Sequence, residues 1–356
     1  MEEKEKEGNG EKPLIPGLQP GLPGIDPVRC LRHRHKLSGC NACVRACPAR
    51  AIRVAEGGVA ISDACTKCGA CVGACPAAAL DLATSPDDPI LSAASGDTAR
   101  FRCEKAKADT DDAVLLPCVS RLDATLILKL ASDGVRKFVF TTGRCAGCPR
   151  RSPSRPVDAV IREAREAAAI SGTALEFETE ERASALDLGK RALFGRILGR
   201  IKDPQAGEGK PEELTALPPP FIPEKKTGLV RALNSLLSGK EPALSRSPLF
   251  TEPVISEEAC SACSICADTC PTAALVAEDT ETAYRITCEP AKCIGCGLCR
   301  DICFMHAVKL VESDPLSSVL KGKTKTLLER KKDSGDGSME WTGEPGQIPD
   351  IPVYDT

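Results

Sequence analysis

The alternation of apolar and polar positions is clearest in the middle of the chain, between residues 98 and 180. Short apolar runs at 113–116, 136–142 and 174–179 predict strands, and helical patterns at 120–133 and 156–170 separate them. Strands that alternate with helices indicate a small parallel α/β domain. We therefore predict such a domain over residues 98–180.

The flanking regions show other patterns. Residues 181–249 carry helical patterns at 185–202 and 227–239 around a Pro-rich stretch, which predicts a helical and Pro-rich linker. Its apolar helix faces are expected to pack on the chain's own domains, in preference to a partner subunit or a membrane surface. The polar, Pro/Gly-rich residues 1–24 predict a disordered N-terminal tail. Residues 313–356 predict a helix followed by a disordered C-terminal tail.

Composition narrows the class of protein. The 356 residues include 21 cysteines, but only 8 Phe, 2 Tyr and 1 Trp, so the core must use small aliphatic side chains or inorganic groups. A formal net charge of −3 does not indicate nucleic acid as a partner. The sequence has no apolar run long enough for a signal peptide or a transmembrane helix. We therefore expect a cytoplasmic protein, in which reduced, closely spaced cysteines usually bind metal.

The cysteines repeat one spacing, C-x2-C-x2-C-x3-C. The full copies cover residues 65–75, 260–270 and 293–303. Pro follows the first two copies, whereas Phe304 follows the third. A degenerate copy covers residues 40–47; it has Leu37 where its first cysteine would stand, and it is preceded by Cys30.

This spacing resembles that of bacterial dicluster ferredoxins, in which three cysteines hold one 4Fe-4S cluster and the fourth, before Pro, binds the other. A short helix and a strand are expected after each proline. The resemblance covers residues 25–85 (module 1) and 250–312 (module 2), and it implies four 4Fe-4S clusters. The crossed ligand sets are set A, Cys30, Cys40, Cys43 and Cys75; set B, Cys65, Cys68, Cys71 and Cys47; set C, Cys260, Cys263, Cys266 and Cys303; and set D, Cys293, Cys296, Cys299 and Cys270.

Alternatives remain for these sets. Zinc sites also use paired C-x-x-C units, but four thiolates in one run with a crossing fourth favour a cluster, and the expected compartment disfavours disulfides. Set A either recruits Cys30 or lacks one ligand and holds a three-iron or labile cluster; we favour Cys30. His33 or His35 could bind instead, although their basic neighbours indicate a solvated loop. Phe304 in place of proline should cost little, because proline does not bind iron.

Four more cysteines, the central set, lie in the predicted α/β domain: Cys103, Cys118, Cys145 and Cys148. Cys118 and the Cys145/Cys148 pair each follow a predicted strand, so a parallel sheet would bring them to one edge. The order "FRCEKA", "LLPCVSR", "GRCAGCP" resembles the delta subunit of methyl-viologen-reducing hydrogenases, which passes electrons between a hydrogenase and heterodisulfide reductase. That resemblance implies a 2Fe-2S cluster, with zinc or reactive thiols as alternatives. Residues 149–151, "PRR", replace the His usual in that family.

One cysteine is left over. Cys288 lies in a strand-like stretch just before the run at 293–303. We expect a buried structural cysteine, rather than an exchangeable ligand or a sensor thiol.

These observations together predict an α+β protein with two ferredoxin-like dicluster modules flanking the small parallel α/β domain. The predicted function is relay of single electrons between subunits of a cytoplasmic oxidoreductase complex, with a hydrogenase, formate dehydrogenase or heterodisulfide-reductase-like partner. The alternatives are a redox or oxygen sensor and a metalloenzyme assembly factor that uses the central Cys-x-x-Cys. No nucleotide-binding G-x-G-x-x-G follows a strand, which favours a non-catalytic subunit over a self-contained enzyme.

Overall fold

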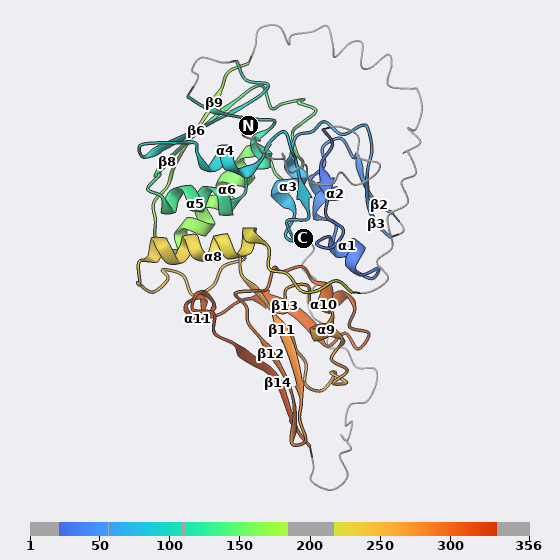
Figure 1. Ribbon diagram of the computed structural model, residues 1–356. Coiled ribbons are helices and arrows are strands. Elements are labelled where there is room, and N and C mark those ends of the chain that lie inside the picture. The colour runs from blue at the N-terminus through green and yellow to red at the C-terminus, as the bar shows by residue number, and fades with distance from the viewer. Residues whose placement is uncertain (1–20, 56, 108–111, 184–216, 333–356) are drawn as a thin grey trace, which may run out of the picture.

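The computed structural model describes residues 21–55, 57–107, 112–183 and 217–332 (Figure 1). Module 1 and the central domain form the upper part in that view, and module 2 forms the lower part. Short helices accompany several small sheets, so the prediction of a mixed α/β protein is confirmed. The helical pattern at 185–202 and most of both predicted tails lie outside the described residues.

Module 1 consists of short elements arranged around its cysteines. Its core includes the cysteine side chains themselves, packed with Leu31, Ile52, Val59 and Leu80. Two pairs of strands are antiparallel: β1 (Gly24–Ile25) with β4 (Leu80–Asp81), and β2 (Ile52–Ala55) with β3 (Gly58–Ile61). Its helices are α1 (Leu31–Arg34), α2 (Ala42–Ala46) and α3 (Ala70–Ala74).

The central domain has parallel strands at the predicted positions, with helices packed against them, and one short strand, Ala94–Ser95, pairs antiparallel in the same sheet. Strands at the three predicted positions are present, but the sequence analysis missed β6, which ends on Cys103 and carries apolar residues at alternate positions. The strands are β5 (Ala94–Ser95), β6 (Thr98–Cys103), β7 (Val114–Leu116), β8 (Lys137–Thr142) and β9 (Glu176–Glu181); β7 and β8 both pair parallel with β6, and β9 pairs parallel with β8. The helices are α4 (Asp87–Leu91), the 3-10 helix η1 (Val119–Arg121), α5 (Ala124–Ser132) and α6 (Val157–Ile170).

Module 2 repeats the pattern of module 1 with longer strands. β10 (Thr251–Ile255) pairs antiparallel with β13 (Val308–Glu312), and β12 (Ala283–Cys288) lies between β11 (Leu275–Asp279) and β14 (Lys325–Lys331). The helices are α9 (Ile265–Asp268), α10 (Leu298–Asp301) and α11 (Leu316–Leu320). The helix α11 falls in the region where a helix was predicted, whereas β14 was not anticipated.

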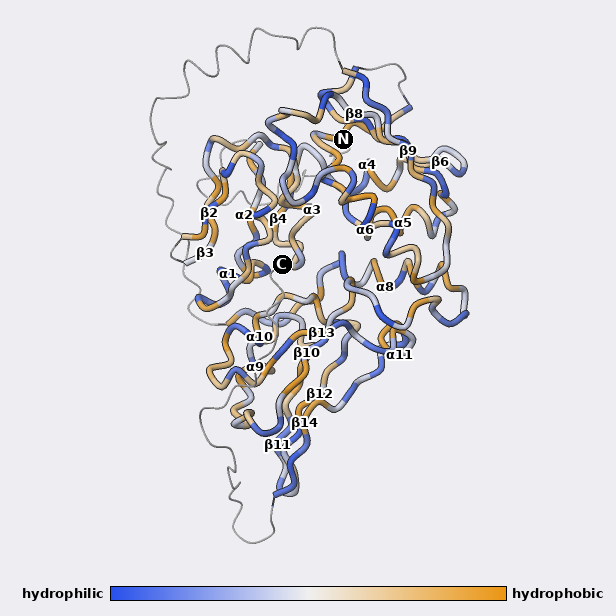
Figure 2. The backbone as a smooth tube through the Cα atoms, turned by 180° about the vertical axis from the view of Figure 1, so that it is seen from behind, coloured by the Kyte–Doolittle hydropathy of each residue, from blue (hydrophilic) through white to orange (hydrophobic). Residues whose placement is uncertain are grey.

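Helix α8 (Glu224–Leu237) ties the upper and lower parts together. Its buried Leu229, Leu233 and Leu237 belong to one core with Leu128 of α5 and Leu316 of α11. Seen from behind, apolar residues mark α5, α6 and α8 where they approach one another (Figure 2). The helix therefore packs on the chain's own domains, as expected. Within the described ranges, no helix combines the length and the apolar character needed to cross a membrane.

Candidate metal centres

The three complete cysteine runs share one backbone conformation. In each run, the second residue after the first cysteine and the residue after the second cysteine have positive φ, a region that ordinary residues rarely adopt. These residues are Lys67 and Gly69, Ala262 and Ser264, and Gly295 and Gly297, with φ between 55° and 77°. Three of the six, Lys67, Ala262 and Ser264, are not glycine, so the repeated cysteine spacing corresponds to a repeated loop conformation.

A tight turn follows the fourth cysteine of every run, and the expectation of a helix after the proline is wrong. The third residue after that cysteine has positive φ, at Arg50, Ala78, Ala273 and His306. Its N–H donates to the cysteine carbonyl, at distances from 2.9 to 3.4 Å. In module 1 the next backbone N–H donates a hydrogen bond to the cysteine sulfur, as Ala51 N does to Cys47 Sγ at 3.2 Å. This closure prevents a helix, and a strand starts instead. The run with Phe304 makes the same turn, so proline is not required there.

Module 1 brings together the thiols of sets A and B. Burial, followed by the charges of the other three members of set A, raises the pKa of Cys43 to about 12. For Cys71 of set B, burial is again the largest cause of a raised pKa, and all three other members of set B contribute. The charge of Cys43 also raises the pKa of Cys71. Each crossed set is therefore a group of neighbours, and the two groups adjoin.

Module 2 shows the same crossed grouping. Burial and the other three members of set C raise the pKa of Cys266 to about 12. Burial and the other three members of set D raise the pKa of Cys299, and Cys266 of set C contributes as well. Sets C and D therefore adjoin in module 2 as sets A and B do in module 1.

The residues fit 4Fe-4S clusters on two structural grounds. Backbone N–H groups point at the ligand sulfurs, as anionic cluster thiolates require: Ala79 N lies 3.3 Å from Cys75 Sγ, and Ala262 N lies 3.4 Å from Cys260 Sγ. The thiols also converge in fours from separate runs. Among the described residues, no group of three or more His, Cys, Asp or Glu side chains is arranged to hold a single metal ion.

The degenerate run differs from the others in a way that bears on set A. Leu37, at the position of the missing cysteine, is 56% exposed, whereas Cys30 contacts the core of module 1. Burial raises the pKa of Cys30, and the charges of Cys75 and Cys40 add to this effect. Cys30 thus occupies the place of the fourth thiol in set A.

The two nearby histidines are engaged elsewhere. His33 Nε2 accepts the N–H of Val59 at 3.3 Å, and His35 Nδ1 accepts the N–H of Leu37 at 3.2 Å. Each of these ring nitrogens is therefore used in a backbone hydrogen bond. The structure gives no support to histidine ligation of set A by those atoms.

The central set converges at the carboxyl edge of the parallel sheet. Its four cysteines line one cavity of about 500 Å³, together with Lys105, Arg144, Arg150 and Arg151. Burial raises the pKa of Cys145, and the charges of the other three members of the set act in the same direction. Gly143 N donates to Cys103 Sγ at 3.3 Å. Four thiols from three strand ends therefore meet beside several cations.

The junction of the central domain with module 1 runs through Cys118 and Cys68. Cys118 packs against the small core that contains Cys68, and the charge of Cys68 contributes to the raised pKa of Cys118 after burial. Gly73 lies so close to η1 that an added Cβ would stand 2.8 Å from the Ser120 carbonyl oxygen. Ser152 Oγ donates to the Ala46 carbonyl at 2.8 Å. The central set therefore adjoins set B.

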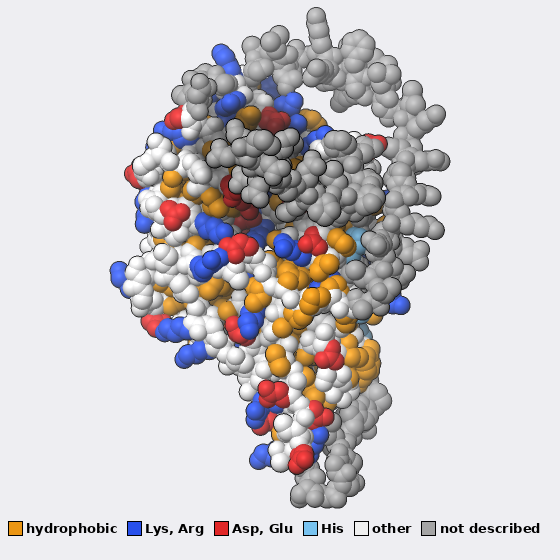
Figure 3. Space-filling view, viewed as in Figure 1, with side chains coloured by type: hydrophobic (Ala, Val, Ile, Leu, Met, Phe, Trp, Pro, Cys, Tyr) orange, Lys and Arg blue, Asp and Glu red, His pale blue; other side chains and the backbone are white. Residues whose placement is uncertain are grey.

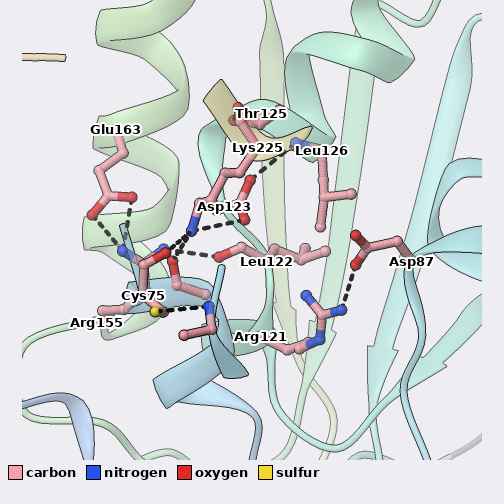
Figure 4. Close-up of polar contacts among 12 residues, drawn as sticks. Cys75, Asp87, Arg121, Leu122, Asp123, Thr125, Leu126, Arg155, Glu163 and Lys225 are labelled. Atoms are coloured by element: carbon pink, nitrogen blue, oxygen red, sulfur yellow. Dashed lines mark hydrogen bonds and ion pairs between the residues drawn. The ribbon is translucent and has the colours of Figure 1, made fainter. Parts of the chain in front are cut away.

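Polar contacts fix this junction (Figure 4). The buried Arg121 guanidinium pairs with Asp87 and donates to the Ser85 carbonyl at 3.1 Å. Lys225 of α8 pairs with Asp123 at 3.1 Å and donates to the Gly73 carbonyl at 2.5 Å. The sequence analysis noted the order "PCVSR" only as part of a resemblance, and it missed the role of Arg121.

The junction of the two modules runs through Cys40 and Cys296. Cys296 and its neighbour Ile294 pack against the core of module 1. Burial raises the pKa of Cys296 to about 12, and the charge of Cys40 contributes after those of two members of set D. Gly39 N donates to Asp301 Oδ2 of module 2 at 2.6 Å. Set A therefore adjoins set D.

Two buried cations stand beside set D. Arg34 donates to the carbonyl oxygens of Val28 and Pro218 at 3.0 and 2.9 Å; burial lowers its pKa, while the charges of Cys270 and Cys296 act to raise it. Lys226 lies over the ring of Phe250, with Nζ 4.1 Å from the centroid. Burial lowers the pKa of Lys226 to about 8, and the charge of Cys293 opposes this. A cluster at set D would supply the anionic partner that these cations require.

Cys288 is fully buried at the end of β12. Burial is the largest cause of the raised pKa of its thiol, and the charges of Cys293 and Glu252 raise this pKa further. The structure thus places a buried thiol next to set D, which agrees with the expectation of a buried cysteine.

Models of three known protein families match segments that contain the cysteine runs. The 4Fe-4S dicluster domain matches residues 38–80, and two models of 4Fe-4S binding domains match residues 253–276 and 290–304. The first match begins after Cys30, so this proposed member of set A lies outside it. No curated protein and no solved structure matches the chain. The chain therefore carries 4Fe-4S ferredoxin-type domains, which support an iron-sulfur electron-transfer role.

We expect Lys226→Met to lower the reduction potential of the set D cluster, because a buried positive charge favours the more negative, reduced state. The expected shift is about 59 mV, which corresponds to tenfold in the ratio of reduced to oxidised cluster at a fixed potential. An electron paramagnetic resonance (EPR) redox titration measures it. Lys226→Arg should keep the wild-type potential, and so should Arg231→Met, which removes an exposed charge from the same helix. Equal potentials in all three variants would contradict the prediction.

Proposed function

We propose that this protein relays single electrons along one unbranched series of five sites. The order is the central set, set B, set A, set D and set C. A 4Fe-4S cluster takes up and gives back one electron when bound at each of sets A to D, and the proposed 2Fe-2S cluster does so at the central set. The proposed ligands are the twenty cysteines of the five sets.

The observation that carries this proposal is the succession of neighbouring thiols. Cys118 packs in one small core with Cys68; Cys43, Cys71, Cys40 and Cys296 share the core of module 1; and Cys266 and Cys299 share the core of module 2. These shared cores link one ligand set to the next, although the sets come from three regions of the chain. Close spacing of this kind is what stepwise electron transfer between protein-bound centres requires.

The chain's own residues support the relay in two ways. Backbone N–H groups and buried cations stabilise anionic thiolates without offering a proton to the reacting site. The contacts of Arg121, Lys225 and Asp301 hold the three units in fixed relative positions, so that the distances between ligand sets stay constant. Both features suit a carrier whose geometry must not change between oxidation states.

We propose that the relay connects subunits of an oxidoreductase complex in the cytoplasm. The resemblance of the central domain to the hydrogenase delta subunit supports a hydrogenase or heterodisulfide-reductase-like partner, and a formate dehydrogenase remains a further candidate. Anaerobic affinity purification of the native complex, followed by identification of the co-purifying subunits, tests this part of the proposal. Recovery of the chain without an oxidoreductase subunit would contradict it.

Metal analysis tests the proposed content of clusters. We expect about 18 iron atoms and no stoichiometric zinc per chain after anaerobic purification, because four cubane clusters and one 2Fe-2S cluster need that amount. The measurement is elemental analysis of iron, sulfide and zinc. About two zinc ions with fewer than about ten iron atoms would reject the proposed sites.

A further inference from the structure

In three of the four runs, the second cysteine lies at a junction between units. Cys68 of set B packs in one small core with Cys118 of the central domain, and Cys40 of set A and Cys296 of set D pack against the same core of module 1. Cys40, Cys68 and Cys296 therefore each lie beside another ligand set. The second cysteine of the remaining run is Cys263 of set C.

Cys263 is not covered in this way. All 21 cysteines lie among the described residues, and Cys263 alone is exposed. It lines one small pocket together with Ile265 and Phe304, which are 38% and 64% exposed. Hydrophobic side chains gather over α9 and the loops beside it (Figure 3). Set C is also the last member of the proposed series, so its outer side has no further site of this chain beside it.

We propose that the surface formed by Cys263, Ile265 and Phe304 docks a partner protein that carries an iron-sulfur centre close to its own surface. This inference rests on the proposed electron-transfer function and adds the place of exchange and the class of partner. The internal junctions supply the reason for that class, because each of them joins one thiol-bearing loop to another across packed apolar residues. An exposed aromatic residue at such a position is a typical anchor of a protein interface.

The exchange is a balanced one-electron step. In one direction, the partner's iron-sulfur centre would lose one electron and a 4Fe-4S cluster bound at set C would gain it. In the other direction, the cluster at set C would lose the electron and the partner's centre would gain it. No bond is made or broken, and no proton needs to move.

The test measures electron transfer into the full-length, iron-loaded protein from a pre-reduced 2Fe-2S ferredoxin. Rapid-freeze EPR follows the loss of the donor signal over a range of donor concentrations. Phe304→Pro introduces the residue that follows the fourth cysteine in the other three runs, so it removes the aromatic anchor while keeping the ligand loop. We expect this variant and Ile265→Ser each to lower the second-order rate about tenfold. Reduction by dithionite, which needs no docking surface, should stay at the wild-type rate.

Matched controls separate the proposal from its alternatives. Val54→Ser removes an exposed apolar residue from module 1 and should leave the ferredoxin rate unchanged. Equal ferredoxin rates for Phe304→Pro, Ile265→Ser and wild type would overturn the docking surface, as would a wild type that shows no saturable transfer. If Phe304→Pro no longer lowered the ferredoxin rate once residues 333–356 were removed, its effect would have come from the chain's own tail, and the docking surface would also be overturned. In each case, reduction of the clusters at all five sites by dithionite would leave the proposed relay intact.

Discussion

Cys30→Ala should remove one 4Fe-4S cluster or convert it to a three-iron form, with a loss of about four iron atoms or about one per chain. The reason is that Cys30 is the proposed replacement for the thiol that the degenerate run lacks at Leu37, and that it lies with Cys40 and Cys75 in the core of module 1. Iron analysis and low-temperature EPR of the anaerobic protein measure the outcome.

The same variant tests the order of the series, because set A lies between set B and set D. Electrons that enter at the central set should no longer reach set C, although dithionite should still reduce the clusters that remain. Cys288→Ala is the matched control: it removes a buried thiol beside set D and should keep the full iron content. Equal iron losses in the two variants would contradict the assignment of Cys30 as the ligand.

The crossed ligand sets can be proposed from the sequence because their information is local: the spacing of each run limits which thiols can reach one cluster. In the structure, cysteines of sets A and B share the core of module 1, and cysteines of sets C and D share the core of module 2. Their assignment as ligands stays a prediction. The parallel arrangement of strands 114–116, 137–142 and 176–181 could be predicted for the same reason, since each is a short apolar run between helical patterns.

Two local features were missed although the sequence carries a signal for them. β6 alternates partly buried and buried residues along "TARFRC", which is the pattern of a half-buried strand. A helix was predicted after each fourth cysteine because proline suits the first turn of a helix. That prediction did not include hydrogen bonds from the backbone to the cysteine sulfur. The N–H groups that a helix would use donate to Cys47 and Cys75 sulfurs instead.

The junctions between units could not be predicted from the sequence. Gly39 and Asp301 are 262 positions apart, and neither is one of the cysteines that define the runs. The meeting of Cys40 with Cys296, and the exposure of Cys263, depend on how two modules and α8 pack together. Periodicity and spacing describe each module separately, so the order of the five sites emerges only when the modules are assembled in space.

Cys103→Ser and Cys118→Ser should each abolish a 2Fe-2S EPR signal and remove about two iron atoms from the full-length protein. Both cysteines line the cavity that contains Cys145 and Cys148, and the charges of both raise the pKa of Cys145. A cluster needs all four sulfurs, whereas a Cys-x-x-Cys dithiol needs only its own pair. Replacing the two residues outside that pair therefore distinguishes the two kinds of site.

The signal should be recorded on the reduced protein at a temperature where the 4Fe-4S signals have broadened beyond detection. Cys288→Ser is the control for loss of a thiol elsewhere and should retain the signal. The cations at the cavity, Arg144 and Arg151 among them, would stabilise an anionic cluster or a reactive thiolate equally, so charge alone does not decide between them. If Cys103→Ser and Cys118→Ser keep full electron transfer, and the wild type shows only a reversible disulfide at Cys145 and Cys148, the central domain is a dithiol site. The series would then begin at set B, because Cys68 would have no redox centre beside it at Cys118.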